Sequence, residues 1–246
     1  MDKREPQITE NPKITLFLRG QTCSQLVQTA MADLHSLKRP LTLRFHKKND
    51  IRPFEDPSSL EFFSAKNDAS LALFGHHSKK RPHGLTFVRF FDAKVYDMLE
   101  LYVNPDTLRT LGQFRNGKCA VGLKPLLAFS GTLFDSPIAN AYTAAKSMFV
   151  DFFRGQEVGS VDVEGLQYMI HFAAAEEEDG RPAPEIHMRV YLIKTKKSGQ
   201  KLPRVEVEEM GPRMDFRIGR RRDPDDAVRK EAYKRPEHAK VCRDEK

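Results

Sequence analysis

The sequence has no hydrophobic run approaching the ~18 residues that a membrane-spanning helix needs, which excludes a transmembrane helix. Residues 1–13 are polar and mixed in charge, unlike a secretory signal. The three cysteines, Cys23, Cys119 and Cys242, lie far apart and form no C-x-x-C pair. This pattern excludes a disulfide framework and a cysteine-rich zinc site, and it favours a reducing compartment. We therefore expect a soluble intracellular protein.

Charge is plentiful and unbalanced. The 246 residues include 41 Lys and Arg against 34 Asp and Glu, a formal net charge of +7. A basic chain favours a polyanionic partner, either nucleic acid or an anionic membrane surface. With 39% hydrophobic residues, the chain is long enough to bury a core as one large domain or two small ones.

The first folded unit is predicted to be a strand followed by a helix. Residues 14–18 are strand-like, and Arg19 and Gly20 interrupt them. Thr22 and Gln25 have the spacing of a helix capping box. Apolar residues then recur at helical spacing until Pro40, which stops the helix.

The same pattern returns about half a chain length later. Residues 126–129 read as a strand, which ends at Ser130 and Gly131. Ser136 and Pro137 suit the N-cap and the first position of a helix whose apolar face runs from Ile138 to Phe152. The repeated order suggests an internal duplication of an α+β half; two unrelated strand–helix units are the alternative.

The remaining elements are placed by periodicity and by turn residues. We expect further strands at residues 41–45, 70–74, 85–91, 166–174, 186–195, 205–209 and 214–218. Short helices are predicted at residues 60–63 and 97–103, and residues 223–246 should form an exposed helix or a disordered tail. The strand at 186–195 alternates, so that one face carries Ile186, Met188, Val190 and Leu192, and the other His187, Arg189, Tyr191 and Ile193.

Three local patterns that suggest chemistry fail on inspection. Residues 112–118 fit G-x-x-x-x-G-K, but Cys119 stands where a phosphate-binding loop needs a magnesium-binding hydroxyl, and no helix is predicted after it. His76, His77 and His83 lack a cysteine or acidic ligand at suitable spacing, and neighbouring cationic side chains oppose a metal ion. The acidic run at residues 176–179 could form a metal or catalytic carboxylate cluster, but we expect it to be a solvated loop. We predict no catalytic, cofactor-binding or metal-binding residues.

Basic clusters are the most informative feature. Residues 76–89 contain three lysines and arginines in a row and no carboxylate, and residues 213–222 are rich in arginine. Such clusters neutralise phosphates and release counterions. A merely solvated surface, or nuclear import signals at residues 79–82 and 220–222, are the alternatives.

Several long segments in order resemble the Brix-domain ribosome assembly factors. They are residues 11–20 (NPKITLFLRG), 62–75 (FFSAKNDASLALFG), 78–87 (SKKRPHGLTF), 124–131 (KPLLAFSG) and 202–219 (LPRVEVEEMGPRMDFRIG). The resemblance implies an α+β fold of two pseudo-symmetric halves, each a small sheet packed with helices and similar to an anticodon-binding domain. It implies an N-terminal extension (1–12), a Brix domain (13–222, with halves at about 13–110 and 120–222) and a basic C-terminal tail (223–246).

What the resemblance implies for function is non-catalytic. The most similar family members pair with the regulator of ribosome synthesis protein as a heterodimer in the nucleolus. They bring the 5S particle, which is 5S rRNA with its two ribosomal proteins, into pre-60S particles, in contact with 25S/28S pre-rRNA and with no membrane. The family often carries a basic N-terminal extension, so some RNA-binding or import residues are expected outside this chain.

Two hypotheses follow. In the first, an RNA-binding scaffold recognises phosphates through basic side chains, namely Lys79, Lys80, Arg81, Arg204, Arg213, Arg217, Arg220, Arg221 and Arg222. In the second, a protein–protein module offers a strand edge, such as that of residues 186–195, and its partner makes most RNA contacts.

Overall fold

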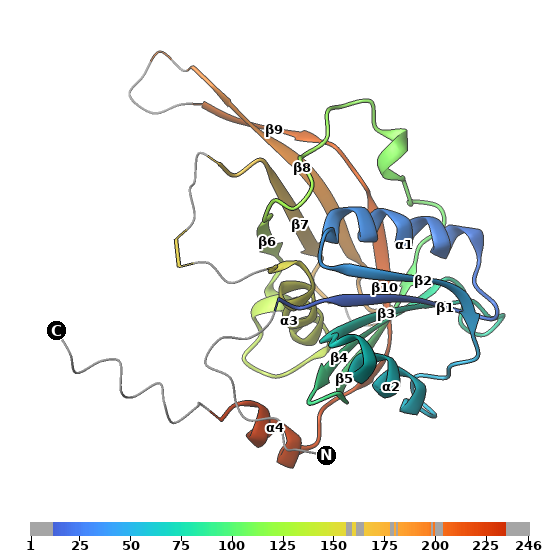
Figure 1. Cartoon of the computed structure of the whole chain (residues 1–246). Helices are drawn as coiled ribbons and strands as arrows, with labels where there is room; N and C mark the ends of the chain where they lie inside the picture. Colours follow the sequence, from blue (N-terminus) through green and yellow to red (C-terminus); the bar gives the residue numbers. More distant parts are fainter. Residues whose placement is uncertain are drawn as a thin grey trace.

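The computed structural model describes residues 12–155, 159–160, 165–177, 180, 182–197, 199 and 204–234. In this part of the chain, ten strands form one mixed sheet with helices on its faces (Figure 1). The strands are β1 (Thr15–Gly20), β2 (Thr42–Asn49), β3 (Leu71–His76), β4 (Gly84–Phe91), β5 (Lys94–Val103), β6 (Leu126–Ser130), β7 (Tyr168–Ala174), β8 (Ile186–Lys196), β9 (Arg204–Glu209) and β10 (Met214–Arg222). The helices are α1 (Gln25–Lys38), α2 (Ser58–Asn67), α3 (Ala141–Phe153) and α4 (Asp226–Ala232), with 3₁₀ turns η1 (Leu111–Gln113) and η2 (Thr132–Asp135).

The order of strands across the sheet is β2-β1-β3-β4-β5-β10-β8-β7-β6, and β9 pairs with β8. β1 is parallel to β3, as β6 is parallel to β7, and the other neighbours between these pairs are antiparallel. The pairing of β5 with β10, which places Val103 opposite Phe216, joins the two halves edge to edge. The small sheets that the family resemblance implies for the two halves are therefore joined into one continuous sheet.

Both predicted strand–helix units exist, but their helices begin later than predicted. α1 is capped by Ser24, whose Oγ accepts from the Val27 amide at 3.3 Å, and not by Thr22. α3 is capped by Asn140, whose side chain accepts from the Thr143 amide at 2.7 Å. Ile138 lies before this cap and is 77% exposed, so it is not part of the apolar face. A short polar residue with a free hydrogen-bond acceptor at the right distance decided the helix start in both cases.

The predicted break after β6 is confirmed, and it requires glycine. Gly131 has φ 118°, and a Cβ there would lie 2.3 Å from the carbonyl oxygen of Ala174. The backbone of β6 thus passes directly against the end of β7, where only glycine fits.

The predicted helix at residues 97–103 is wrong, because this segment lies within strand β5. β5 is paired on both edges, with β4 and with β10, and its side chains enter both faces of the sheet. Met98 packs in the core on one face, and Leu99 in the core on the other. A strand buried on both faces reads as a continuous apolar run, which periodicity does not distinguish from a short buried helix.

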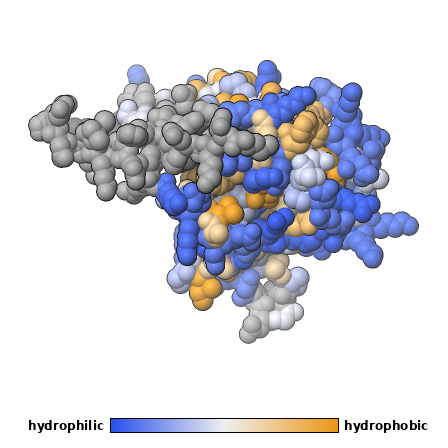
Figure 2. Space-filling view, turned by 60° about the horizontal axis from the view of Figure 1, so that its bottom comes forward, coloured by the Kyte–Doolittle hydropathy of each residue, from blue (hydrophilic) through white to orange (hydrophobic). Residues whose placement is uncertain are grey.

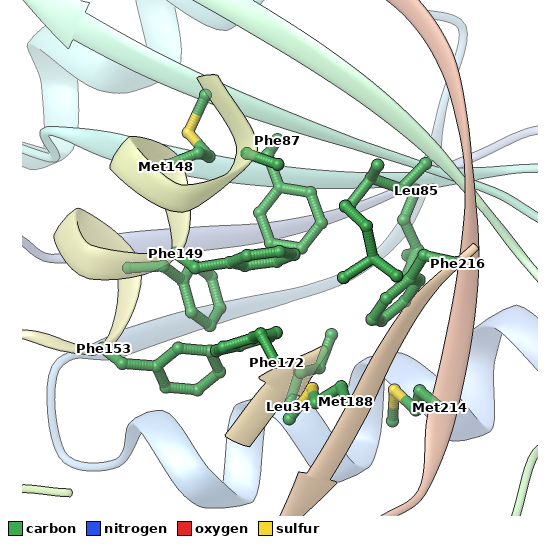
Figure 3. Close-up of a cluster of buried hydrophobic side chains, with 14 of the residues drawn as sticks. Leu34, Leu85, Phe87, Met148, Phe149, Phe153, Phe172, Met188, Met214 and Phe216 are labelled. Atoms are coloured by element: carbon green, nitrogen blue, oxygen red, sulfur yellow. The ribbon is translucent and has the colours of Figure 1, made fainter. Parts of the chain in front are cut away.

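α1 and α3 pack on one face of the sheet over a core rich in phenylalanine, shown in Figure 3. Phe149 of α3 stacks on Phe172 of β7 with ring centroids 4.2 Å apart, and it meets Phe87 of β4 edge to face at 5.7 Å. These contacts join elements from both halves of the chain. α2 covers the opposite face of the first half, where Leu60 packs with Leu16 and Phe74. In the second half, no helix of the described chain covers that opposite face.

The surface agrees with the composition. Figure 2 shows a face that is mostly hydrophilic, with small, separated hydrophobic patches. Among the described residues, no helix combines the length and the apolar character needed to span a bilayer. Residues 1–11 and 235–246, which include most of the predicted extension and half of the predicted tail, lie outside the described residues. In the described part of the tail, residues 223–234, α4 is the helix.

Candidate nucleic-acid interface

Three of the predicted residues lie on the loop between β3 and β4. Lys79 and Lys80 are exposed, and Arg81 is half-buried. Reciprocal backbone hydrogen bonds between Ser78 and Arg81, at 3.1 and 3.2 Å, close a tight turn around the two lysines. The loop is fixed at both ends, because the His77 amide donates to the Thr22 carbonyl and the Val103 amide donates to the His83 carbonyl. Three cationic side chains are therefore held on an ordered turn.

The strand register brings Arg217 next to this loop. Gly84, which follows the loop, lies opposite Tyr102 of β5, and Tyr102 lies opposite Arg217 of β10. The Arg217 guanidinium lies 5.1 Å from the centroid of the Tyr102 ring and is exposed. Stacking on an aromatic ring orients an arginine without neutralising its charge.

Arg220 is different, because a buried carboxylate holds it. Glu100 of β5 is fully buried, and its two oxygens accept from Arg220 Nε at 2.9 Å and Nη2 at 3.0 Å. Tyr102 Oη and His76 Nε2 also donate to this carboxylate, at 2.7 and 2.8 Å when His76 carries its proton on Nε2. Burial alone would raise the pKa of Glu100, but these hydrogen bonds, led by those from Arg220, hold it below its ordinary value. Glu100 therefore anchors Arg220 and compensates much of its charge, but it takes only two of its five side-chain N–H groups.

The same environment shifts the neighbouring groups. Burial is the main reason that the pKa of His76 is lowered, and the cations Arg220 and Arg81 add to this against the opposing effect of Glu100. Burial and the hydrogen bond to Glu100 raise the pKa of Tyr102 to about 12. Near neutral pH we therefore expect the cluster to contain a neutral imidazole, an ionised carboxylate and an intact phenol.

Three other predicted arginines are paired with carboxylates. Arg204 lies 3.2 Å from Glu206, Arg213 forms a fork onto Glu209, and Arg221 lies 2.7 Å from Asp223. Arg222 is exposed, opposite Met98, and has no carboxylate partner among the described residues. The predicted residues that are brought together without such a partner in the described chain are Lys79, Lys80, Arg81 and Arg217, which we call the basic rim.

Sequence reasoning missed a cleft beside the basic rim. Arg81 and Arg220 both line it, together with Arg52, His76 and His77. One feature of the sequence could have indicated this cleft: the polar residues Gln21 and Thr22 come directly after a buried strand.

The uncovered sheet face of the second half is also polar. The alternation predicted for β8 is confirmed: Ile186, Met188 and Val190 are buried, and the residues between them face away from the core. Arg189 on this face donates to Asp215 at 2.6 Å. Among the described residues, Glu185, His187 and Asp215 are the one group whose metal-ligating atoms lie within 4.8 Å of one another. Because Arg189 already occupies the Asp215 carboxylate, the arrangement suits an ion-pair network and gives no reason to assign a metal.

The near-match to a phosphate-binding loop has the wrong architecture. Within residues 111–125, all of which are described, the backbone is irregular apart from η1. Lys118 Nζ donates to the carbonyls of Phe114 and Met210, at 3.1 and 2.7 Å. This lysine therefore braces the loop against the end of β9.

The β8–β9 hairpin forms an arm with two different faces. Its far end projects beyond the helices at the upper left of Figure 1. One face carries cross-strand ion pairs of Lys194 with Glu208 and Lys196 with Glu206. The other exposes Val205 and Val207, at 61% and 53%. Within the described chain β9 pairs only with β8, so its outer edge is open.

Residues 20–220 of the chain match the Brix domain. The chain therefore belongs to the Brix domain family.

Within that family it is a homologue of ribosome production factor 2. It is 52% identical to "Ribosome production factor 2 homolog" of Chaetomium thermophilum, over 96% of this chain and 74% of that protein. It is 45% identical to "Ribosome biogenesis protein RPF2" of Saccharomyces cerevisiae, over 97% and 70%. It is 40% identical to the human "Ribosome production factor 2 homolog", over 98% and 75%.

Proposed function

We propose that this chain is a non-catalytic ribosome biogenesis factor that binds 5S rRNA and pre-rRNA in the nucleolus. With the regulator of ribosome synthesis protein, it recruits the 5S particle and its two ribosomal proteins into pre-60S particles. The names of its homologues support the ribosomal context. The observation that carries RNA binding is the basic rim, in which four cations stand together with no carboxylate partner in the described chain.

The chemistry of the basic rim suits a phosphate backbone. Lys79 and Lys80 are exposed point charges, and Arg217 is an oriented fork. A-form RNA hides its base edges in a deep, narrow major groove, so proteins recognise it largely through shape, phosphates and 2′-hydroxyls. Recognition of folded rRNA through this surface should therefore weaken as the salt concentration rises.

A titration of fluorescently labelled 5S rRNA with the chain, at several salt concentrations, tests this function. We expect saturable binding whose log K falls linearly with log salt. Absence of binding at low salt by both the chain and its heterodimer would overturn the proposal.

A second candidate function is a protein–protein scaffold whose partner makes most RNA contacts. The arm favours it, because exposed valines on an edge strand offer apolar area and free backbone groups to a partner. A gel-shift comparison on 5S rRNA separates the two functions. Equal affinity of the lone chain and the heterodimer supports direct binding, and a large gain on adding the partner supports the scaffold.

We also propose that the two halves, about residues 13–110 and 120–222 within a Brix domain spanning 13–222, are related by a pseudo-two-fold axis, each similar to an anticodon-binding domain. The strand order supports this, because β1-β3-β4-β5 is mirrored by β6-β7-β8-β10 about the β5–β10 pair. Each half places one helix, α1 or α3, on the same core. β2 and α2 are then additions to the first half, and β9 is an addition to the second.

A further inference from the structure

A cleft of about 370 Å³ opens at the carboxyl ends of β1 and β3. Its walls come from the loop after β1, the segment between β2 and α2, the loop after β3, and Arg220 of β10. Its volume falls within the roughly 300–1,000 Å³ that is typical of sites for small molecules and cofactors.

The position of the cleft follows from the topology. β1 is parallel to both β2 and β3, and the chain leaves β1 and β3 in opposite directions, toward β2 and toward β4. α1 packs against one face of these strands and α2 against the other. In sheets of this kind, ligands bind in the crevice beyond the carboxyl ends of the strands, where the order reverses.

Two guanidinium groups in the cleft are arranged for an anion. Glu100 takes two N–H groups of Arg220, and the guanidinium lies 4.1 Å from the centroid of the Phe54 ring. Since a guanidinium has five N–H donors, three remain on a side chain whose orientation is already fixed. Arg81 lines the same cleft and has no carboxylate partner in the described chain. A guanidinium that is fixed, as that of Arg220 is, can bind phosphate through paired hydrogen bonds.

The other walls suit an aromatic base. The half-buried Phe54 supplies apolar surface, and the amide side chains of Gln21 and Asn49 can pair with polar base edges. His77 Nδ1 accepts from the His83 amide at 3.2 Å, which leaves its Nε2–H as a donor when the ring is neutral.

Two carboxylates also line the cleft. Glu55 is paired with Arg52 at 3.2 Å and also interacts electrostatically with Arg220, and Asp50 is exposed. Arg81 and the three remaining N–H groups of Arg220 are the donors that we assign to an anion, and Asp50 and Glu55 oppose its binding.

We propose that this cleft receives one unpaired RNA nucleotide, with its phosphate on Arg81 and Arg220 and its base among the aromatic and amide side chains. The inference rests on the proposed RNA-binding function and adds a single-stranded element to it. A free nucleotide has the same chemistry, but Lys79, Lys80 and Arg217 stand next to the cleft and would hold flanking phosphates, which favours a polymer.

The test titrates the full chain with three probes: labelled pentauridylate, an abasic pentamer of equal charge, and 5′-AMP. We expect pentauridylate to bind about tenfold or more tightly than the abasic pentamer, because stacking and edge contacts are lost without bases. Equal affinity for the two pentamers would overturn the proposal. Binding of 5′-AMP that is as tight as that of pentauridylate would also overturn it, and would assign the cleft to a free nucleotide.

Matched variants separate the cleft from general charge. Arg81→Gln and Lys80→Gln each remove one cation from the same loop, but only Arg81 lines the cleft. We expect about a tenfold loss of pentauridylate affinity for Arg81→Gln, against about threefold or less for Lys80→Gln. Asp50→Asn should tighten binding about twofold, which misfolding would not do. Equal losses for the two loop variants would overturn the proposal.

Failure of the cleft and failure of the proposed function give different results. If the chain binds 5S rRNA with strong salt dependence but does not distinguish the two pentamers, the cleft proposal falls and the function stands. If neither the chain nor its heterodimer binds any RNA, the function itself is overturned.

Discussion

Arg89 of β4 and Asp151 of α3 form an ion pair with an N···O distance of 2.6 Å, and neither side chain is more than 17% exposed. Arg89 also forms a fork onto Asp97 of β5, and Lys13 reaches Asp151 at 2.6 Å. The pair joins a helix of the second half to the sheet of the first. Burial alone would raise the pKa of Asp151, but Lys13 and Arg89 more than offset this and hold it below its ordinary value.

We expect Asp151→Asn to lower the free energy of unfolding by about 2–3 kcal/mol at pH 7, because it leaves buried cations without their shared carboxylate. Arg89 retains Asp97, which keeps the loss below that of a fully orphaned charge. Urea denaturation measures the difference.

The pH dependence gives this prediction a sign. A depressed folded-state pKa contributes stability that is present above the ordinary value of 3.8 and is lost as the pH falls through the folded-state pKa. The difference in the free energy of unfolding between wild type and Asp151→Asn should therefore shrink below about pH 4. Asp223→Asn, which removes an exposed partner of Arg221, is the control and should change stability by less than about 0.5 kcal/mol. If this difference in the free energy of unfolding stayed constant from pH 7 to pH 3, the lowered pKa of Asp151 would be contradicted.

Replacement of a buried lysine should stabilise the protein. Lys38, at the end of α1, is 5% exposed, its Nζ has no hydrogen-bond partner, and burial is the main reason that its pKa is lowered to about 8. Contact with the ring of Phe152 at 5.6 Å offsets only part of this desolvation. We expect Lys38→Met to raise the free energy of unfolding by about 1–2 kcal/mol at pH 7.

The difference in the free energy of unfolding between Lys38→Met and wild type should decrease between pH 8 and pH 10.5. In that window the unfolded chain holds a proton that the folded wild type has released, so the wild type gains stability as the pH rises. Lys66→Met on the exposed side of α2 is the matched control. Thermal unfolding across this pH range would refute the prediction if this difference grew with pH.

Nearly all the strands, and the central parts of α1, α2 and α3, could be predicted from hydrophobic spacing, because spacing records which side chains face a core. The first residues of the helices were harder to predict. Ser24 and Thr22 are equally good N-caps in the sequence, and only the path of the folded chain selects one of them. Met98 and Leu99 were misassigned because each belongs to a different core, and the cores exist only after distant segments have packed.

The candidate interface was predictable in composition but not in pairing. The turn at Lys79 and Lys80 could be found because it lacks carboxylates in sequence. Arg220 looked equivalent, but Glu100, 120 residues earlier, forms an ion pair with it, a long-range contact that local charge counting does not detect. Charge reversal at residues 220–222 would therefore disrupt a buried network as well as a surface, which makes it a poor test of RNA binding.

The lysines of the basic rim provide a cleaner test. Removing both by Lys79→Gln and Lys80→Gln should weaken binding to 5S rRNA and reduce the magnitude of the slope of log K against log salt by about 1.5, since each released phosphate contact contributes about 0.7–0.9. The control is the pair Arg204→Gln and Arg221→Gln, which also removes two cations but takes them from existing ion pairs. Fluorescence anisotropy at four salt concentrations measures both slopes. Identical slopes for the two double variants would remove Lys79 and Lys80 from the RNA-binding surface.

The arm should act in protein association without contributing to the core. Val205 and Val207 are exposed on β9, whose outer edge is open in the described chain, so their replacement by serine removes apolar area without leaving a cavity. We expect Val205→Ser with Val207→Ser to weaken association with the proposed partner, the regulator of ribosome synthesis protein, about tenfold or more. The free energy of unfolding of the lone chain should change by less than about 1 kcal/mol. Co-purification and calorimetric titration measure the first effect, and urea denaturation the second.

The double replacement Lys194→Gln and Lys196→Gln, on the opposite face of the arm, is the matched control. Unchanged association in the valine variant, or an equal loss in the lysine variant, would show that the apolar face of the arm is not the contact surface.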